Sequence, residues 1–128
     1  VCAVMDARCG QVYNAVFSAD GKKLQRLTPD RAISVEELSR ECEKYAKPIF
    51  LAGDGAKLCY NDIRFKALGA ALPPEPLIYQ RACSVAQAAE HAAAEGKTVP
   101  SADLMPVYLR PAQAQRALKN KLSEGKKL

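Results

Sequence analysis

The chain has 128 residues, of which 48% are hydrophobic and 26% charged, with five cysteines and a formal net charge of +5. This length suits one domain that buries roughly two-thirds of its unfolded surface, and no apolar run approaches the ~20 residues that span a bilayer. The five cysteines are widely spaced and contain no Cys-x-x-Cys pair, which argues against a disulfide framework or a zinc site. We therefore expect a soluble, cytoplasmic protein with reduced thiols.

The excess positive charge is confined to the C-terminal end. From Val107 onward there are six basic residues and one acidic residue, whereas the preceding 106 residues hold 13 of each kind. A neutral body argues against a nucleic-acid-binding face on it. The basic tail could contact RNA phosphates through Arg116, Lys119 and Lys121, although a solvated helix end explains the same residues.

Three strands are expected first, over residues 2–7, 11–19 and 24–33. Arg8-Cys9-Gly10 and Asp20-Gly21 are the turn signals between them. Because the connections are this short, the three strands must be antiparallel.

A helix is expected next, because the spacing of apolar residues changes at Ser34. Ser34 and Glu37 form a capping-box pattern, and the helix should end before Pro48. Its apolar stripe is Val35, Leu38, Cys42 and Tyr45. The continuous apolar run 49–52 then predicts a central strand that is covered on both faces.

A glycine-rich turn, Gly53-Asp54-Gly55, leads into a second helix with Ala56, Cys59, Ile63 and Ala67 on one stripe. Residues 77–79 are predicted as a short strand. A capping-box pattern at Ser84 and Gln87 opens an alanine-rich helix that ends at Gly96, and its alanine face should approach the sheet closely. Pro111 suits the first position of a last helix.

The predicted order is therefore β-β-β-α-β-α-β-α followed by a tail helix, which makes the chain an α/β protein with a mixed sheet. This order is that of the ribonuclease-H-like unit, which occurs twice in the actin/Hsp70-like ATPase fold. We expect residues 1–110 to form one such lobe and residues 111–128 to form a basic helix and tail.

Few residues suggest chemistry of their own. Gly53, Asp54 and Gly55 could hold a phosphate at a strand-to-helix turn, but a tight turn with Asp54 as helix N-cap explains them better, since Asp54 would repel a phosphate. His91 has no partner ligand at metal-binding spacing, so a surface histidine is the simpler interpretation. Asp6 is expected to tie down the first hairpin. No cofactor, metal ion or catalytic residue is predicted.

Four segments in register resemble the C-terminal lobe of the TsaB family. The hairpin carries Asp6, Arg8, Gly10 and Tyr13, and the closing segment Pro106-Val107-Tyr108-Leu109-Arg110 carries Tyr108 and Arg110. Gly53-Asp54-Gly55-Ala56 and Ala94-Glu95-Gly96-Lys97 lie between them in the same order. The family has two ribonuclease-H-like lobes, so the resemblance implies that this chain is the second lobe, without its N-terminal lobe. Tyr108 is expected to anchor the C-terminal segment.

The resemblance also implies a function. TsaB is the non-catalytic partner of TsaD and supports the ATPase TsaE in making threonylcarbamoyladenosine beside the anticodon of tRNA. The resemblance implies that the N-terminal lobe provides most of the contacts for TsaD binding and for self-dimerisation. The tRNA would be bound by the complex and contacted only indirectly by this subunit. Two alternatives remain open. One is an enzyme, either a metal-dependent glycoprotease-like peptidase or an actin-like nucleotide hydrolase. The other is a small RNA-binding module that uses the basic tail.

Overall fold

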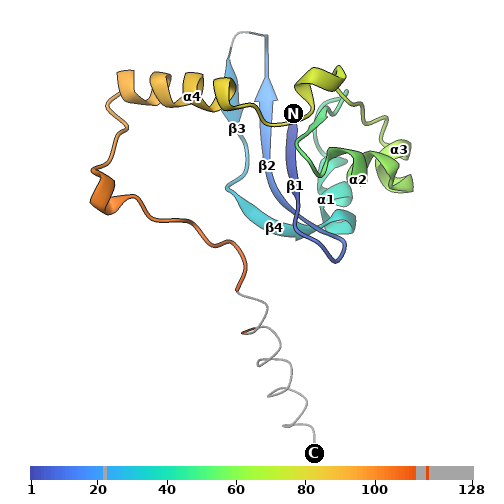
Figure 1. Cartoon of the computed structure of the whole chain (residues 1–128). Coiled ribbons are helices and arrows are strands. Elements are labelled where there is room, and N and C mark those ends of the chain that lie inside the picture. Colours follow the sequence, from blue (N-terminus) through green and yellow to red (C-terminus); the bar gives the residue numbers. More distant parts are fainter. Residues whose placement is uncertain (22, 112–114, 116–128) are drawn as a thin grey trace, which may run out of the picture.

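The computed structural model describes residues 1–21, 23–111 and 115. A mixed sheet forms the centre of the molecule, with the strand order β3-β2-β1-β5 and with β4 also paired to β2 (Figure 1). Strand β1 (Cys2–Asp6) runs antiparallel to β2 (Gln11–Ala19), and β5 (Leu51–Ala52) runs parallel to β1. The prediction of an α/β protein with a mixed sheet is confirmed.

The predicted third strand over residues 24–33 is wrong in one respect, because two strands occupy that range. Strand β3 (Leu24–Arg26) pairs with the end of β2, and β4 (Arg31–Ser34) pairs with its beginning. Between them the Thr28 hydroxyl accepts the Val16 amide at 2.8 Å. Pro29 follows and has no backbone N–H to donate to the hydrogen bonds of a sheet, so the strand is interrupted here.

Helix α1 (Val35–Cys42) begins as the sequence predicts. The Ser34 hydroxyl accepts the Glu37 amide at 3.1 Å, and the Glu37 carboxylate accepts the Ser34 amide at 3.3 Å, which completes the capping box. The helix ends at Cys42, earlier than Pro48 alone would require. Tyr45 is only partly buried against the core.

The predicted second helix is two helices, α2 (Ala56–Asn61) and α3 (Ile63–Ala67). Asp62 is extended between them, and its carboxylate accepts the Arg64 amide at 2.9 Å, so it ends one helix and caps the next. The break rotates α3 relative to the expected stripe. As a result Phe65 is fully buried, whereas Ile63 is 79% exposed.

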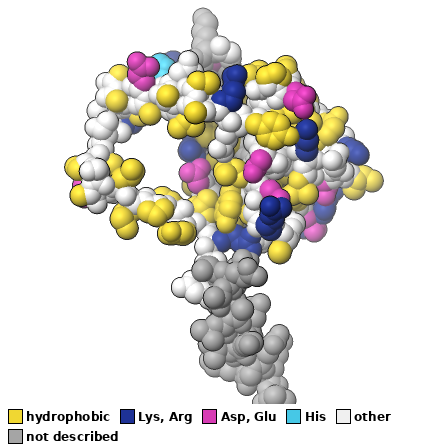
Figure 2. Space-filling view, viewed as in Figure 1, with side chains coloured by type: hydrophobic (Ala, Val, Ile, Leu, Met, Phe, Trp, Pro, Cys, Tyr) yellow, Lys and Arg dark blue, Asp and Glu magenta, His cyan; other side chains and the backbone are white. Residues whose placement is uncertain are grey.

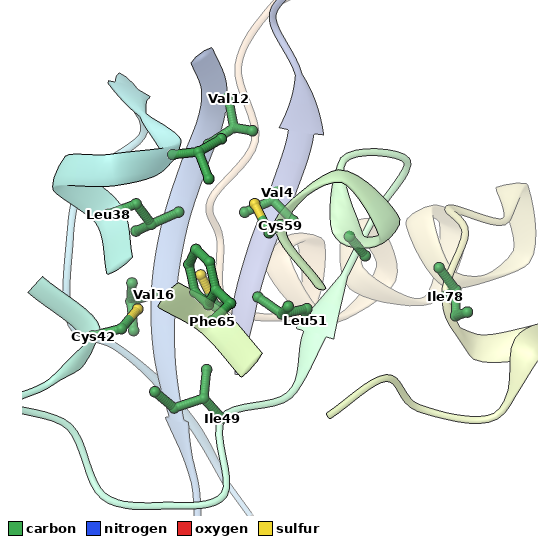
Figure 3. Packing of buried hydrophobic residues seen from close by; sticks show 13 residues of the cluster. Val4, Val12, Val16, Leu38, Cys42, Ile49, Leu51, Cys59, Phe65 and Ile78 are labelled. Atoms are coloured by element: carbon green, nitrogen blue, oxygen red, sulfur yellow. The ribbon is translucent and has the colours of Figure 1, made fainter. Parts of the chain in front are cut away.

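The core lies between one face of the sheet and the helices α1, α2 and α3. Alternate residues of β1 and β2 (Val4, Val12 and Val16) point toward these helices and meet Leu38 and Phe65 (Figure 3). The thiols of Cys2, Cys42 and Cys59 are buried in the same cluster. Phe50 is 40% exposed, so the run 49–52 is not covered on both faces as the sequence predicted.

The segment after the core is where prediction and structure differ most. Residues 77–79 form no strand; a 3₁₀ turn, η1 (Glu75–Leu77), precedes the buried Ile78. Helix α4 (Ala82–Ala94) begins two residues before Ser84 and has no side-chain cap. It extends away from the sheet on the side opposite α1, α2 and α3 (Figure 1), and none of its residues is buried. The predicted close approach of its alanine face to the sheet is therefore wrong.

Candidate functional site

The first hairpin is held by Asp6. Its carboxylate accepts the Arg8 amide at 2.7 Å and the Arg8 guanidinium at 3.3 Å. Arg8, Cys9 and Gly10 all have positive φ, which tightens the turn. The expectation that Asp6 ties down the hairpin is met, and the chain leaves the turn with Gln11 at the start of β2.

The Gly53-Asp54-Gly55 turn packs directly against the backbone of β1. A Cβ on Gly53 would lie 2.1 Å from the Val4 carbonyl oxygen, and one on Gly55 would lie 3.0 Å from the Asp6 nitrogen. The Gly53 amide donates to the Ile78 carbonyl at 2.6 Å, and the Gly55 amide donates to the Val4 carbonyl at 3.1 Å. Because both glycine amides are engaged inside the protein, this arrangement favours the tight-turn interpretation over a phosphate contact.

Asp54 has a different role from the one predicted. Gly55, not Asp54, is the N-cap of α2, and it makes no side-chain cap hydrogen bond. The Asp54 carboxylate instead accepts the Asp6 amide at 3.1 Å. Asp54 therefore ties the turn to the end of β1, so the expectation of a helix cap is wrong.

The second face of the sheet carries an open groove of about 770 Å³. Its floor is made by the residues of β1 and β2 that alternate with the core residues, since successive strand side chains point to opposite faces. Leu77, Tyr79 and the start of α4 form one wall, and the 107–110 segment forms the other. The floor residues are Ala3, Met5, Tyr13, Ala15 and Phe17.

Two of the four segments that carry the resemblance, the hairpin and the closing segment, meet at this groove. The Arg110 guanidinium donates a hydrogen bond to the Ala7 carbonyl, across 103 positions of sequence. Tyr13 and Tyr108 line the same groove. Tyr108 is 84% exposed, so Arg110, and not Tyr108 as predicted, fastens this segment to the body.

Figure 2 shows the groove side of the molecule. Helix α4 and the chain that follows it, which includes the 3₁₀ turn η2 (Ser101–Asp103), pass round an opening before reaching the hairpin. Apolar side chains are exposed along this path. They are Val85, Val99, Leu104, Met105, Val107 and Tyr108. Exposed apolar side chains of this size on one segment are a feature of interaction sites.

Charges at the groove are mainly basic. The Arg26 guanidinium bonds the Asp30 carboxylate at 2.7 Å and lies 4.8 Å from the centre of the Phe17 ring. Arg81 and Arg110 lie at the other edges. With three guanidinium groups and one carboxylate, the groove lining has a net positive charge.

A second charged cluster lies at the other side of the sheet, around Glu41. Its carboxylate bonds the Arg31 guanidinium at 2.9 Å and accepts the Tyr45 hydroxyl at 2.9 Å. The hydrogen bond from Arg31 holds the pKa of Glu41 below its usual value. Burial, followed by the bond to Glu41, raises the pKa of Tyr45 to about 12. The cluster fastens β4 to α1.

The cysteines are all free, and three of them are buried. Contact with the Cys42 thiol, followed by burial, raises the pKa of Cys2, and burial raises the pKa of Cys59 to about 12. Within the described residues no three His, Cys, Asp or Glu side chains are grouped so that they could hold a metal ion. His91 is exposed on α4, as expected.

Two predictions remain, on RNA contact by the basic tail and on membrane-spanning segments. The RNA-contact candidates Arg116, Lys119 and Lys121 lie outside the described residues. None of the described helices combines the length and the apolar character needed to cross a bilayer.

Comparison with known proteins gives a likeness of fold. The structure is similar to the crystal structure of an uncharacterized protein from Pseudomonas aeruginosa that is described as similar to the peptidase YeaZ, with a TM-score of 0.55 and 22% identity. The match covers 85% of this chain and 48% of that one, so this chain spans about half the length of the neighbour. No family model matches the sequence, and no curated protein matches it.

Proposed function

We propose that this chain is a TsaB-like lobe that serves as a non-catalytic binding subunit in the synthesis of threonylcarbamoyladenosine on tRNA. In this role it would belong to the assembly of the catalytic subunit TsaD and the ATPase TsaE. The mixed sheet, with its antiparallel hairpin and the parallel β1–β5 pair, is consistent with a ribonuclease-H-like lobe of the actin-like fold. The similarity to a YeaZ-like structure, YeaZ being another name for TsaB, supports the same assignment.

The observation that carries the proposal is that the hairpin and the closing segment, two of the four resemblance segments, meet at one apolar groove. Asp6 and Arg8 shape the hairpin, and Arg110 binds the hairpin at Ala7. Tyr13 and Tyr108 then face the same groove. An exposed tyrosine beside an open apolar surface adds little to the stability of the fold. The same arrangement is expected in a subunit that works by contact with other proteins.

The test is a pull-down of TsaD from the same organism. The 128-residue chain and the full-length product of its gene are compared as bait, with TsaE present and absent. We expect the full-length product to retain TsaD, because the resemblance assigns most of the TsaD contact to an N-terminal lobe. Retention by the 128-residue chain alone would also support the proposal and would place the contact on this lobe. Failure of both baits would overturn it.

A variant pair locates the contribution of the groove. Arg110→Ala removes the hydrogen bond to Ala7 and should free the 107–110 segment from the hairpin. Arg40→Ala removes an exposed guanidinium on α1 that bonds Glu36 at 2.6 Å, and it serves as the matched control. If the groove supports the assembly, only Arg110→Ala lowers the yield of threonylcarbamoyladenosine when TsaD, TsaE, tRNA and the threonylcarbamoyl adenylate are supplied. Equal yields from both variants would remove the groove from the proposal.

A further inference from the structure

The groove on the second face of the sheet gathers aromatic side chains. The chain has five tyrosines and three phenylalanines, and four of these eight residues line the groove. Tyr13 and Phe17 lie on its floor, and Tyr79 and Tyr108 lie on its walls. Tyr79 is 45% exposed and Tyr108 is 84% exposed, so a ligand can reach their rings from solvent. Half of the aromatic side chains of this chain therefore meet on one open surface.

The floor has a recess between its two aromatic rings. Tyr13 and Phe17 are four positions apart on β2, so their Cα atoms are about 13 Å apart. Ala15 lies between them on the same face, and Ala3 of β1 pairs with Ala15. Because alanine side chains are short, they leave space between the two rings. Stacked bases are about 3.4 Å apart, so a recess of this length has room for two or three of them.

The groove also carries guanidinium groups without a carboxylate partner. Arg81 and Arg110 form no ion pair with the described residues, and Arg110 bonds only the Ala7 carbonyl. Arg26 differs, because the Asp30 carboxylate already binds it at 2.7 Å. Unpaired guanidinium groups are suited to bind phosphate. Figure 2 shows basic and apolar side chains bordering the same opening.

The sequence argues against a nucleic-acid-binding face on the body, because acidic and basic residues balance over the first 106 positions. In the structure this balance does not hold at the groove. Several carboxylates of the body are bonded to basic side chains of α1, β4 and α3 instead, among them Glu36, Glu41 and Asp62. The average charge of the body therefore does not describe this surface.

We propose that the groove binds a single strand of nucleic acid, with bases stacked on the aromatic rings and phosphates held by Arg81 and Arg110. Proteins that bind single strands combine a positively charged groove with aromatic side chains on which bases stack. A duplex should gain nothing from the rings, because its base faces are covered by neighbouring bases. An acidic peptide would pair with the guanidinium groups but would bring no planar bases to the aromatic side chains.

This binding does not depend on the proposed function, in which tRNA is contacted only indirectly by this subunit. The two proposals can therefore fail separately. A chain that does not bind TsaD can still bind a single strand, and a chain that binds no nucleic acid can still belong to the complex.

The first measurement is fluorescence anisotropy of a labelled oligouridylate of about ten nucleotides, a length within the usual range of site sizes. The unmodified 128-residue chain should bind it with a Kd of about 1–100 µM at low salt. An oligodeoxyribonucleotide of the same length should bind as well, because neither stacking nor phosphate contact needs the 2′-hydroxyl. Absence of binding to both at protein concentrations above this range would overturn the proposal.

A pair of tyrosine variants separates the groove from the basic tail, which is present in both. Tyr108→Ala should raise the Kd for the single strand ~5-fold or more, the loss expected for one stacked base, and should leave binding of an RNA duplex unchanged. Tyr60→Ala is the matched control, because it removes a 38% exposed tyrosine from α2, on the core side of the sheet. Circular dichroism checks that both variants remain folded. Equal effects of the two variants, or no effect of either, would show that the groove does not bind the strand.

The salt dependence of binding tests the phosphate contact at Arg81. For single strands the slope of log Kd against log salt concentration falls by ~0.7 for each phosphate contact that is lost. Arg81→Gln should lower the slope by this amount. Lys66→Gln removes the same charge from an exposed position on α3 and should leave the slope unchanged. Identical slopes for the two variants would contradict the assignment of Arg81.

Nuclear magnetic resonance of the isotope-labelled chain locates the bound strand. On addition of the oligouridylate, amide signals of residues 77–84 and 107–110 should shift, since these segments form the walls of the groove. Shifts confined to residues 112–128 would mean that the tail alone binds RNA, and the proposal would be wrong. A glutamate-rich peptide that shifts the groove signals at lower concentration than the oligouridylate would assign the groove to an acidic protein segment instead.

Discussion

Replacement of Gly53 by alanine tests how firmly the turn after β5 is built into the sheet. Gly53 has φ +108, a conformation that side-chain-bearing residues rarely adopt, and an added Cβ would lie 2.1 Å from the Val4 carbonyl oxygen. That oxygen belongs to the backbone of β1, which is fixed between β2 and β5. The clash can be relieved only by moving the turn away from the sheet.

The expected cost follows from what the movement breaks. The positive φ alone costs about 1–2 kcal/mol for an L-residue. Displacement of the turn also breaks the bonds from the Gly53 amide to the Ile78 carbonyl and from the Gly55 amide to the Val4 carbonyl, each contributing about 1 kcal/mol. The sum is about 3–4 kcal/mol, a large part of the ~5–15 kcal/mol by which a domain is stable.

Urea unfolding followed by far-UV circular dichroism measures this cost, with Gly69→Ala as the control. Gly69 also has positive φ, at +67, but nothing lies within 4 Å of its added Cβ, so its variant should lose only about 1 kcal/mol. With a slope of about 1.5 kcal/mol per M, Gly53→Ala should lower the urea midpoint by ~2 M and Gly69→Ala by less than 1 M. Equal shifts would refute the reasoning that backbone contact with β1 dictates glycine at position 53.

Two further predictions concern charge and thiol accessibility. The folded pKa of Glu41 is lowered by the bond from Arg31, so Glu41 contributes stability that is present above its unfolded pKa and is lost as pH falls through the folded value. Urea midpoints measured from pH 6 to pH 3 should therefore fall less steeply for Glu41→Gln than for the unmodified chain, and parallel curves would contradict the assignment. Iodoacetamide should modify Cys9 and Cys83 in the folded protein, as counted by mass spectrometry, because they are exposed. The buried thiols of Cys2, Cys42 and Cys59 should react only in urea. Fast modification of all five cysteines without urea would show that the core is open.

Local signals in the sequence predicted the first hairpin and the start of helix α1 well. The hairpin of β1 and β2 follows from the turn residues Arg8-Cys9-Gly10, and α1 follows from the capping box at Ser34 and Glu37. In both places the residues that decide the structure are neighbours along the chain. A pattern read over a few positions therefore contains the information needed.

Elsewhere the deciding contacts come from competing or distant groups. The stripe through Cys59 and Ile63 has helical spacing, yet Asp62 ends α2 because its carboxylate caps α3. Aspartate is a preferred N-cap residue, and at this position the cap outweighs the helical periodicity of the apolar residues. Thr28 broke the third strand in a similar way, by taking the Val16 amide.

The groove itself could not be predicted from the sequence, although the residues that identify it could. The resemblance points to Tyr13, Tyr108 and Arg110, and in the structure all three line one surface. The hydrogen bond from Arg110 to the Ala7 carbonyl cannot be predicted from the sequence, because every residue has a backbone carbonyl and the residue type at position 7 does not mark it as an acceptor. The alanines of α4 lie on several sides of the helix, so they likewise carry no signal of where the helix packs.

The glycine turn and the groove are connected through the first strand. Gly53 and Gly55 hold the turn against β1, and Asp54 takes the Asp6 amide at the end of that strand. Asp6 in turn shapes the hairpin that presents the Ala7 carbonyl to Arg110. A loosened turn should therefore release the 107–110 segment and open one wall of the groove. The Gly53-Asp54-Gly55 turn therefore positions the groove wall through Asp6, besides lining the groove directly at Gly53.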